Sequence, residues 1–292
     1  AGAARSAPVA SADTFQAALE GAAITIPQLL RQRAAMHGDA LALREKDYGI
    51  WNPYSWRHYY ETARAVALGL LSLGVKPGDR IAIAGENTPE WFYADLGTQM
   101  IGAVAVGIYP TNPWVELQYI VKHSGARMVV TGDQEQTDKV LEAWPQLPQL
   151  KHTIAIDMKG LRYYPEPPAA FEDIEARGRE YEKDHPGLVD ELLDGQRMDD
   201  TALMIYTSGS TGPPKGAMIS WGNLHAAAPG LIELLQADDR GSSLSYLPLC
   251  HVAEQAVTNI APVYAGSSVS FGESLRTVQE DLREIAPTFF LG

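Results

Sequence analysis

Residues 206–216 (YTSGSTGPPKG) concentrate small polar groups around one lysine. Glycines let the backbone approach a ligand closely, hydroxyl side chains add hydrogen-bond donors, and a lysine supplies positive charge. A hydrogen bond to a charged group contributes about 1.5–3 kcal/mol, so a few of them give useful affinity for a nucleotide. The pattern predicts a phosphate-binding loop at residues 207–215, called the phosphate loop from here on. Its candidate ligands are Thr207, Ser208, Gly209, Ser210, Thr211, Gly212 and Lys215.

Two other interpretations of the phosphate loop fit less well. A flexible Gly/Ser linker does not normally follow an apolar run such as 202–206 (ALMIY) or carry a lone lysine between proline and glycine. The P-loop motif G-x-x-x-x-G-K-[ST] fails because Lys215 follows Pro214 and precedes Gly216. Prolines also lack the N–H donors that a P-loop directs at phosphate. The loop therefore holds phosphate by another design.

The elements that must position this loop are clearest between residues 80 and 131. Thr88 and Asn112 are expected helix N-caps, since each is followed by a proline at the first helical position. Apolar strands that alternate with helices imply a mostly parallel, doubly wound sheet with helices on both faces. Such sheets bind ligands beyond the carboxyl ends of their strands. The expected strands are 81–84, 103–109 and 127–131, and the expected helices are 56–74, 87–102 and 112–125.

Composition along the chain suggests four parts. They are a disordered leader (1–15), a first α/β lobe (16–158), a charged connecting segment (159–200) with a solvated helix near 171–183, and the start of a second α/β lobe (201–292) that carries the phosphate loop and is truncated. In the second lobe we expect an apolar strand at 244–249 and a helix at 275–285. Four apolar residues of that helix recur at helical spacing and are expected in the core: Leu275, Val278, Leu282 and Ile285.

The overall composition excludes several classes of function. Of the 292 residues, 46% are hydrophobic and 20% are charged, which is typical of a packed globular protein, and the net charge is −13. A chain this acidic is a poor candidate for general nucleic-acid binding. The longest apolar runs are far shorter than the ~20 residues of a membrane span. Cys250 is the only cysteine, so no intrachain disulfide can form, and a reducing, cytoplasmic location is expected, with peripheral membrane association as a further option.

The phosphate loop resembles that of the adenylate-forming enzymes, which include the acyl-CoA synthetases. Every fixed position of the usual form T-S-G-[ST]-T-G-x-P-K-G is matched at residues 207–216. The resemblance runs from about Thr25 to the last residue. Three further segments resemble long-chain acyl-CoA synthetases: 77–91 (PGDRIAIAGENTPEW), 246–255 (YLPLCHVAEQ) and 287–292 (PTFFLG). The resemblance implies the N-terminal part of the large domain of such an enzyme.

The resemblance also implies residue roles. The ligands of the phosphate loop would surround the phosphates of ATP, and Thr207 would also lie near Mg²⁺. His251 would be the catalytic-site histidine at the pocket for the carboxylate and the adenylate, although a single histidine is by itself more often structural. Glu254 would support structure. Gln255 stands where long-chain members commonly have arginine, and Trp221 where many members have histidine, so no role is carried over to either.

The implied activity is that of a long-chain fatty acid–CoA ligase, which forms an acyl-adenylate from ATP and a fatty acid and then an acyl-CoA. ATP and Mg²⁺ are the implied cofactors, with CoA as co-substrate. The family's later motifs do not occur before Gly292, so this chain is expected to be inactive by itself. The alternative is a non-catalytic nucleotide-binding or interaction module. Phe289 and Phe290 fall in an expected strand (288–291) whose uncovered edge would favour self-association.

Overall fold

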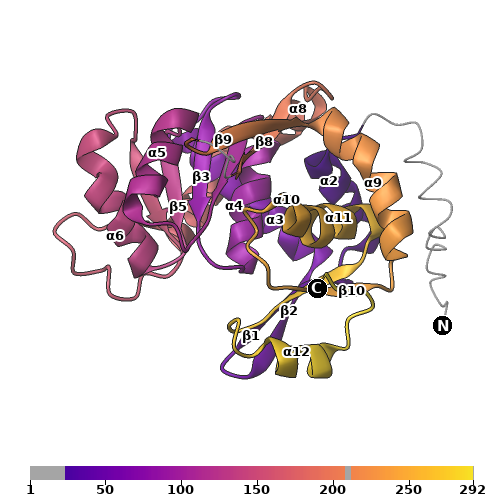
Figure 1. Cartoon of the computed structure of the whole chain (residues 1–292). Coiled ribbons are helices and arrows are strands. Elements are labelled where there is room, and N and C mark those ends of the chain that lie inside the picture. Colours follow the sequence, from indigo (N-terminus) through magenta and orange to yellow (C-terminus); the bar gives the residue numbers. More distant parts are fainter. Residues whose placement is uncertain (1–23, 208–211, 292) are drawn as a thin grey trace, which may run out of the picture.

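The computed structural model describes residues 24–207 and 212–291, and Figure 1 shows two sheets surrounded by helices. The predicted leader at 1–15 lies outside the described residues, as do Ser208, Gly209, Ser210 and Thr211 of the phosphate loop. Within residues 24–207 and 212–291, none of the helices combines the length and apolar character that a bilayer crossing requires.

The larger sheet has seven strands in the order β7-β6-β5-β3-β4-β8-β9. Neighbours are parallel except β8 and β9, which form an antiparallel hairpin. The three strands expected between residues 81 and 131 are confirmed and lie side by side. The strands are β3 (Arg80–Ala84), β4 (Val104–Ile108), β5 (Met128–Thr131), β6 (His152–Ala155), β7 (Ala169–Ala170), β8 (Thr201–Thr207) and β9 (Lys215–Ser220).

Helices cover both faces of this sheet, which confirms the doubly wound architecture. Side chains alternate along β3, so Ile81 and Ile83 join one hydrophobic core while Ala82 and Ala84 join another. The first core includes residues of α3 (Trp56–Ser72), α4 (Pro89–Met100) and α7 (Phe171–Asp184). The second includes residues of α5 (Trp114–Ser124) and α6 (Gln134–Ala143). Both faces are buried, which is why the strands read as continuous apolar runs.

A second sheet joins parts of the chain that are far apart in sequence. Its order is β10-β11-β1-β2, with β1 parallel to β11 and antiparallel to β2. Each sheet combines strands from both predicted lobes. In this sheet β1 of the first lobe pairs with β11 of the second, and in the larger sheet β4 of the first lobe pairs with β8 of the second. The division of the chain into two lobes stays a prediction. The strands are β1 (Leu41–Asp47), β2 (Ile50–Ser55), β10 (Ser242–Ser245) and β11 (Ser268–Phe271).

Helix starts follow local side-chain chemistry. Thr88 caps α4 as predicted, since its hydroxyl accepts a hydrogen bond from the backbone N–H of Trp91 at 3.3 Å. The prediction that Asn112 caps the next helix is wrong. The N–H of Asn112 closes a turn onto the carbonyl of Tyr109, and α5 starts after Pro113. The remaining helices are α2 (Ile26–His37), η1 (Trp144–Gln146), α8 (Leu188–Asp194), α9 (Trp221–Leu235), α10 (Val252–Glu254), the π-helix η2 (Gln255–Ile260), α11 (Ala261–Ala265) and α12 (Val278–Ile285).

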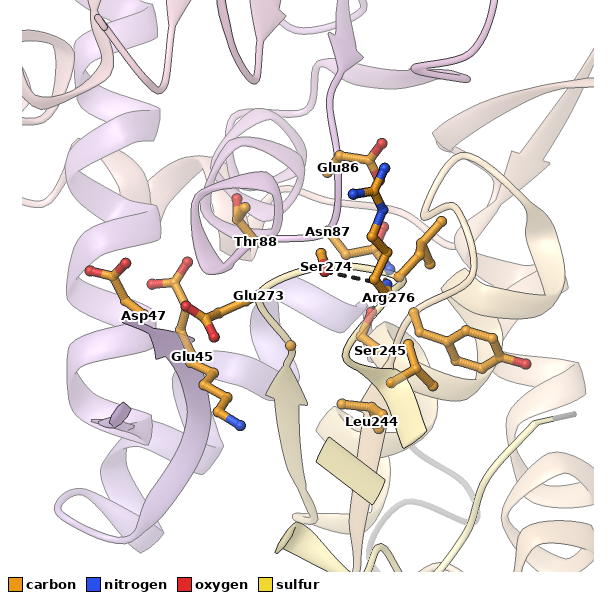
Figure 2. A pocket seen from close by; sticks show the side chains of 15 residues that line it. Glu45, Asp47, Glu86, Asn87, Thr88, Leu244, Ser245, Glu273, Ser274 and Arg276 are labelled. Atoms are coloured by element: carbon orange, nitrogen blue, oxygen red, sulfur yellow. Dashed lines mark hydrogen bonds between the residues drawn. The ribbon is translucent and has the colours of Figure 1, made fainter. Parts of the chain in front are cut away.

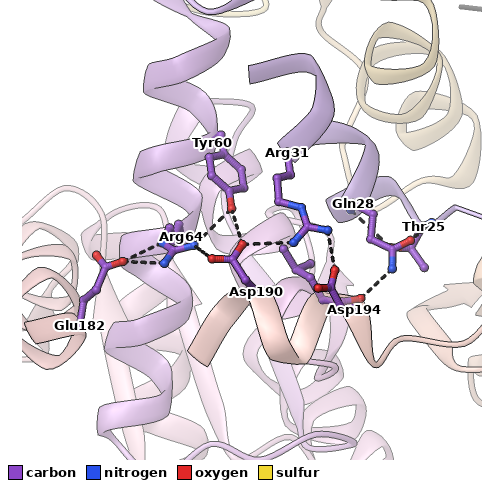
Figure 3. A network of polar contacts seen from close by, with 9 residues as sticks. Thr25, Gln28, Arg31, Tyr60, Arg64, Glu182, Asp190 and Asp194 are labelled. Carbon is purple, nitrogen blue, oxygen red and sulfur yellow. Dashed lines mark hydrogen bonds and ion pairs between the residues drawn. The ribbon is translucent and has the colours of Figure 1, made fainter. Parts of the chain in front are cut away.

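The helix expected to be solvated, α7, instead packs against α3. It buries Phe171, Ile174 and Gly178, and its Glu182 pairs with Arg64 of α3 at 2.6 Å. Nearby, α8 is joined to α2 and α3 by ion pairs (Figure 3). Arg31 contacts Asp190 at 3.2 Å, and Arg64 contacts the same carboxylate at 2.9 Å. The charged segment 159–200 therefore packs on the helices that cover the larger sheet and is part of the folded structure.

Two expectations near the end of the chain are corrected. The four apolar residues of 275–285 were expected in the core. This expectation is wrong for Leu275, which is 63% exposed, and the buried residue of α12 is Asp281. Residues 288–291 form no strand. The N–H groups of Thr288 and Phe289 both donate to the carbonyl of Ser242, and Phe289 is 7% exposed. Phe289 is therefore covered by its own chain, whereas Phe290 is 39% exposed.

Candidate functional site

The candidate site lies where β4 and β8 end. A cavity of about 270 Å³ opens there and includes two of the predicted site residues, Thr207 and His251. Carboxyl ends of parallel strands are the usual ligand-binding edge of such sheets. The lining residues are Tyr109, Asn112, Glu116, Ile120, Ile205, Tyr206, Thr207, Pro214, His251 and Val252.

The β8–β9 hairpin carries the phosphate loop. Thr207 ends β8, Lys215 begins β9, and the two residues pair across the antiparallel ladder. Directly paired residues send their side chains to the same face of a sheet. Both residues are exposed, so the hydroxyl and the ammonium are available to a ligand. Gly212 has φ +98°, a backbone conformation that other residues rarely adopt. The local backbone therefore requires glycine at this position, whether or not a ligand is bound.

Helix α5 holds the stem of the phosphate loop. The Tyr119 hydroxyl donates to the carbonyl oxygen of Pro214 at 3.0 Å. Its ring stacks on that of His123, whose Nδ1 lies 2.8 Å from the Tyr206 hydroxyl. Both sides of the hairpin stem are thus tied to one helix. Pro214 has no N–H to offer a phosphate, and its carbonyl is used for this anchor instead.

His251 sits on a turn that presses against β4. A Cβ at Gly107 of β4 would lie 2.7 Å from the Cα of Cys250, so the close approach of the turn requires glycine there. The Nδ1 of His251 accepts a hydrogen bond from the N–H of Ala253 at 3.2 Å. The neutral ring therefore carries its hydrogen on Nε2, and this nitrogen is the donor available to a ligand. The side chain of His251 is exposed.

Two buried carboxylic acids flank the helix that follows His251. Glu254 accepts hydrogen bonds from the Ser245 hydroxyl at 2.8 Å and from the N–H of Tyr246 at 3.2 Å. Burial raises the pKa of Glu254 to about 7. On α4, burial also raises the pKa of Asp95 to about 7. Glu254 is consistent with the predicted structural role, because its contacts hold the segment before His251 and do not line the ligand cavity.

The described residues offer oxygen and nitrogen donors but no ready-made metal cage. No group of three or more His, Cys, Asp or Glu side chains in the described ranges is arranged to hold a metal ion. A Mg²⁺ ion bound through nucleotide phosphates needs only one or two protein ligands. The exposed hydroxyl of Thr207 at the mouth of the cavity fits that requirement.

Several residues that line the cavity or hold the stem of the phosphate loop were not expected from the sequence. Tyr109 and Asn112 follow the end of β4, and Tyr119 and His123 lie four residues apart on α5. The position directly after an apolar strand was the signal for Tyr109, since strand ends form the ligand edge. The anchor from Tyr119 had no sequence signal, because its partner lies 95 positions away along the chain.

Solved structures of acyl-CoA ligases share this fold. A putative long-chain-fatty-acid CoA ligase from Rhodopseudomonas palustris matches 90% of this chain and 61% of its own, with a TM-score of 0.73 and 24% sequence identity. The anthranilate CoA ligase AuaEII, solved in complex with anthranoyl-AMP, matches 91% of this chain and 49% of its own, with a TM-score of 0.76 and 21% identity. The architecture is that of the N-terminal part of this class of ligases.

Sequence comparison defines the family. The model of the AMP-binding enzymes matches residues 30–292, and the chain belongs to that family. It is 34% identical over 281 residues to long-chain-fatty-acid–CoA ligase ACSBG2 of Xenopus laevis, and 32% identical over 283 residues to ACSBG1 of Homo sapiens. Each match covers 92% of this chain, which spans 37% of each relative. The resemblance seen in the phosphate loop is thereby confirmed.

Proposed function

We propose that this chain is the nucleotide-phosphate-binding, N-terminal portion of an AMP-forming long-chain fatty acid–CoA ligase. The observation that supports the proposal is the meeting of Thr207, Pro214 and His251 in one cavity at the carboxyl ends of β4 and β8. The ATP phosphates bind the phosphate loop, including Ser208, Gly209, Ser210, Thr211 and Gly212. The fatty acid carboxylate lies on the His251 side of the cavity.

The proposed reaction has two steps. A carboxylate oxygen of the fatty acid attacks the α-phosphorus of ATP, and the bond to the β-phosphate bridging oxygen breaks, so pyrophosphate leaves. The CoA thiol then loses its proton, attacks the acyl carbonyl carbon and displaces AMP. In the first step Lys215 and the loop hydroxyls neutralise and orient the departing pyrophosphate, and the Nε2–H of His251 donates to an oxygen at the reacting centre. Positioning and charge neutralisation supply most of the acceleration in such chemistry.

Magnesium, ATP and CoA belong to the same proposal. The Thr207 hydroxyl would hold Mg²⁺, and the ion, when bound, would neutralise phosphate charge. The chain length of the acid is taken from the relatives, which are named as long-chain ligases. We further propose that the protein is cytoplasmic and associates peripherally with membranes, where long-chain acids concentrate. We also propose that it self-associates through residues 288–291, where Phe290 is 39% exposed.

Binding of pyrophosphate and MgATP to this chain tests the phosphate loop directly. Lys215→Ala should weaken the affinity about tenfold to a hundredfold, because one charge-assisted hydrogen bond is lost. Lys183→Ala is the matched control, since Lys183 is exposed on α7 and forms a surface ion pair with Glu180. Equal affinities of wild type and Lys215→Ala, measured by isothermal titration calorimetry, would contradict the proposal.

A non-catalytic nucleotide-binding module is the second candidate. The chain spans 37% of the length of the two ligases it matches, so the activity of a whole ligase is part of the proposal. Fatty-acid-dependent exchange between ATP and pyrophosphate separates the two. Exchange by any longer form of the protein that contains this chain supports the ligase. Nucleotide binding without exchange in every such form supports the module.

A further inference from the structure

The side chain of Asn87 bridges the two sheets at the turn that carries His251. Asn87 lies just beyond the carboxyl end of β3. Its Nδ2 donates to the carbonyl oxygen of Leu247 at 2.7 Å and to the Ser245 hydroxyl at 2.8 Å, and its Oδ1 accepts from the N–H of Leu249 at 3.3 Å. Residues 246–251 are called the His251 turn here.

These contacts explain why the His251 turn is not a strand. The sequence predicts a strand over 244–249, but β10 ends at Ser245. Beyond that point the backbone groups of Leu247 and Leu249 bond to Asn87 instead of to a neighbouring strand. An amide side chain can donate to a carbonyl through its nitrogen and accept from an N–H through its oxygen at once. Asn87 therefore fixes both the direction and the register of the turn.

Glu254 completes the attachment from the other end. The Ser245 hydroxyl receives the hydrogen bond of Asn87 and donates its own to Glu254 Oε1 at 2.8 Å. Glu254 follows His251 by three residues, and the N–H of Gln255 bonds to the carbonyl of His251. The chain Asn87–Ser245–Glu254 thus encloses His251 between two fixed points. Hydrogen bonds that share partners in this way reinforce one another.

Asn87 has no evident part in folding its own helix. The start of α4 is capped by Thr88, not by Asn87. Asn87 is half-buried and, with Ser245, lines a cavity of about 500 Å³ between the two sheets (Figure 2). Its hydrogen bonds all go to residues 245–249, more than 150 positions away. These bonds therefore hold the segment that leads from β10 of the second sheet to His251 at the candidate site.

We propose that Asn87 is a positioning residue that holds His251 in the orientation that receives the fatty acid carboxylate, an inference that rests on the proposed function. Asn87 does not touch the substrate. It acts through the His251 turn, so its removal changes the placement of His251 while the phosphate loop is left as it is.

A double-mutant cycle tests the coupling. The probe is cis-parinaric acid, a fluorescent long-chain fatty acid, titrated into the 292-residue chain. Asn87→Ala should weaken its affinity about as much as His251→Ala does, roughly tenfold each. In the His251→Ala background, Asn87→Ala should have less than about a twofold further effect, because it acts through a residue already removed. Additive effects, or no effect of Asn87→Ala, overturn the inference. If cis-parinaric acid does not bind, or if His251→Ala leaves its affinity unchanged, the proposed function fails and the inference about Asn87 is decided by the next measurement.

A ligand-free measurement decides the inference even if that function fails. In histidine labelled with ¹³C, the His251 ring signal is identified by its loss in His251→Gln. We expect Asn87→Ala to shift or broaden this signal and Asn87→Asp, which keeps only the acceptor, to do the same. The control Asn223→Ala removes a capping amide on α9 and should leave the signal unchanged. Circular dichroism identifies any variant that fails to fold. An unchanged His251 signal in a folded Asn87 variant refutes the proposal.

Discussion

Asp95 is a buried acid whose partners are all neutral. It accepts hydrogen bonds from the side-chain amides of Gln99 and Asn259, each at 2.7 Å, and from Gln255 at 3.5 Å. The resemblance places an arginine at position 255 in many long-chain members, and this chain has glutamine there. Within the described part of the chain, the hydrogen-bond partners of Asp95 carry no positive charge, and burial raises the pKa of Asp95 to about 7.

This environment makes stability depend on pH in a defined direction. Between the ordinary pKa of 3.8 and the folded value of about 7, the folded chain binds the proton that the unfolded chain has released. The unfolding free energy should therefore fall as pH rises from about 4 to 7, by on the order of 4 kcal/mol from this group. Asp95→Asn should lack this part of the slope. Urea unfolding at pH 4.5, 6 and 7.5 measures it, with Glu254→Gln as the comparison. Parallel pH curves for wild type and Asp95→Asn would show that the group titrates normally.

At the scale of elements, α7 lies so close to α3 that only a glycine fits at their contact. A Cβ at Gly178 would collide with the carbonyl oxygen of Ala65 and lie 2.8 Å from the amide nitrogen of Gly69. These are backbone atoms of α3, which cannot move aside as a side chain can. Phe171 and Ile174 complete the buried face of α7. The charged segment that looked like a connector is therefore positioned by small residues at this contact as well as by its ion pairs with α2 and α3.

Gly178→Ala should destabilise the chain by roughly 1–3 kcal/mol, because the added methyl group forces the two helices apart. Gly230→Ala is the matched control. Gly230 is exposed on α9, and a Cβ there meets nothing within 4 Å. That change should stabilise by about 0.5–1 kcal/mol, since alanine favours helix. Thermal unfolding of both variants gives the comparison. Equal effects of the two substitutions would mean that the α3–α7 contact is looser than described.

At the scale of the whole molecule, the second sheet and the end of the chain hold each other. The Tyr246 hydroxyl donates to the carbonyl of Leu291 at 2.7 Å, and the Tyr246 ring stacks on Phe290 at 4.9 Å between centroids. Lys46 of β1 forms ion pairs with Asp281 and Glu284 of α12. Figure 1 shows α12 beside β1 and β2. Residues near 45 and near 285 thus form one structural unit.

Phe289→Ala should destabilise the chain by about 3–5 kcal/mol, as is usual for a buried phenylalanine. Phe290→Ala should cost less than about 1 kcal/mol, because this ring is 39% exposed and loses only a stacking contact. Urea unfolding measures both. Sedimentation velocity of Phe290→Ala tests self-association, which should weaken if this ring lies in the interface. Similar stability losses at the two positions would contradict the burial of Phe289.

The sequence by itself determined the family and the parallel strands, and it predicted the phosphate loop. These signals are local: the loop residues are contiguous, and apolar runs mark strands that are buried on both faces. Thr88 was predictable as a cap for the same reason, since its partner lies three residues away. The roles predicted for Lys215 and His251 stay predictions that the cavity supports.

Only the tertiary structure decided which distant segments share an edge. The pairing of β1 with β11 joins Leu43 to Val269, and the bonds of Asn87 to the His251 turn cross more than 150 positions. The failed cap at Asn112, the packed face of α7 and the covered Phe289 have the same origin. Each depends on which backbone or side chain a residue meets in space. Hydrophobic spacing and capping patterns describe neighbours along the chain, so they carry no record of those partners.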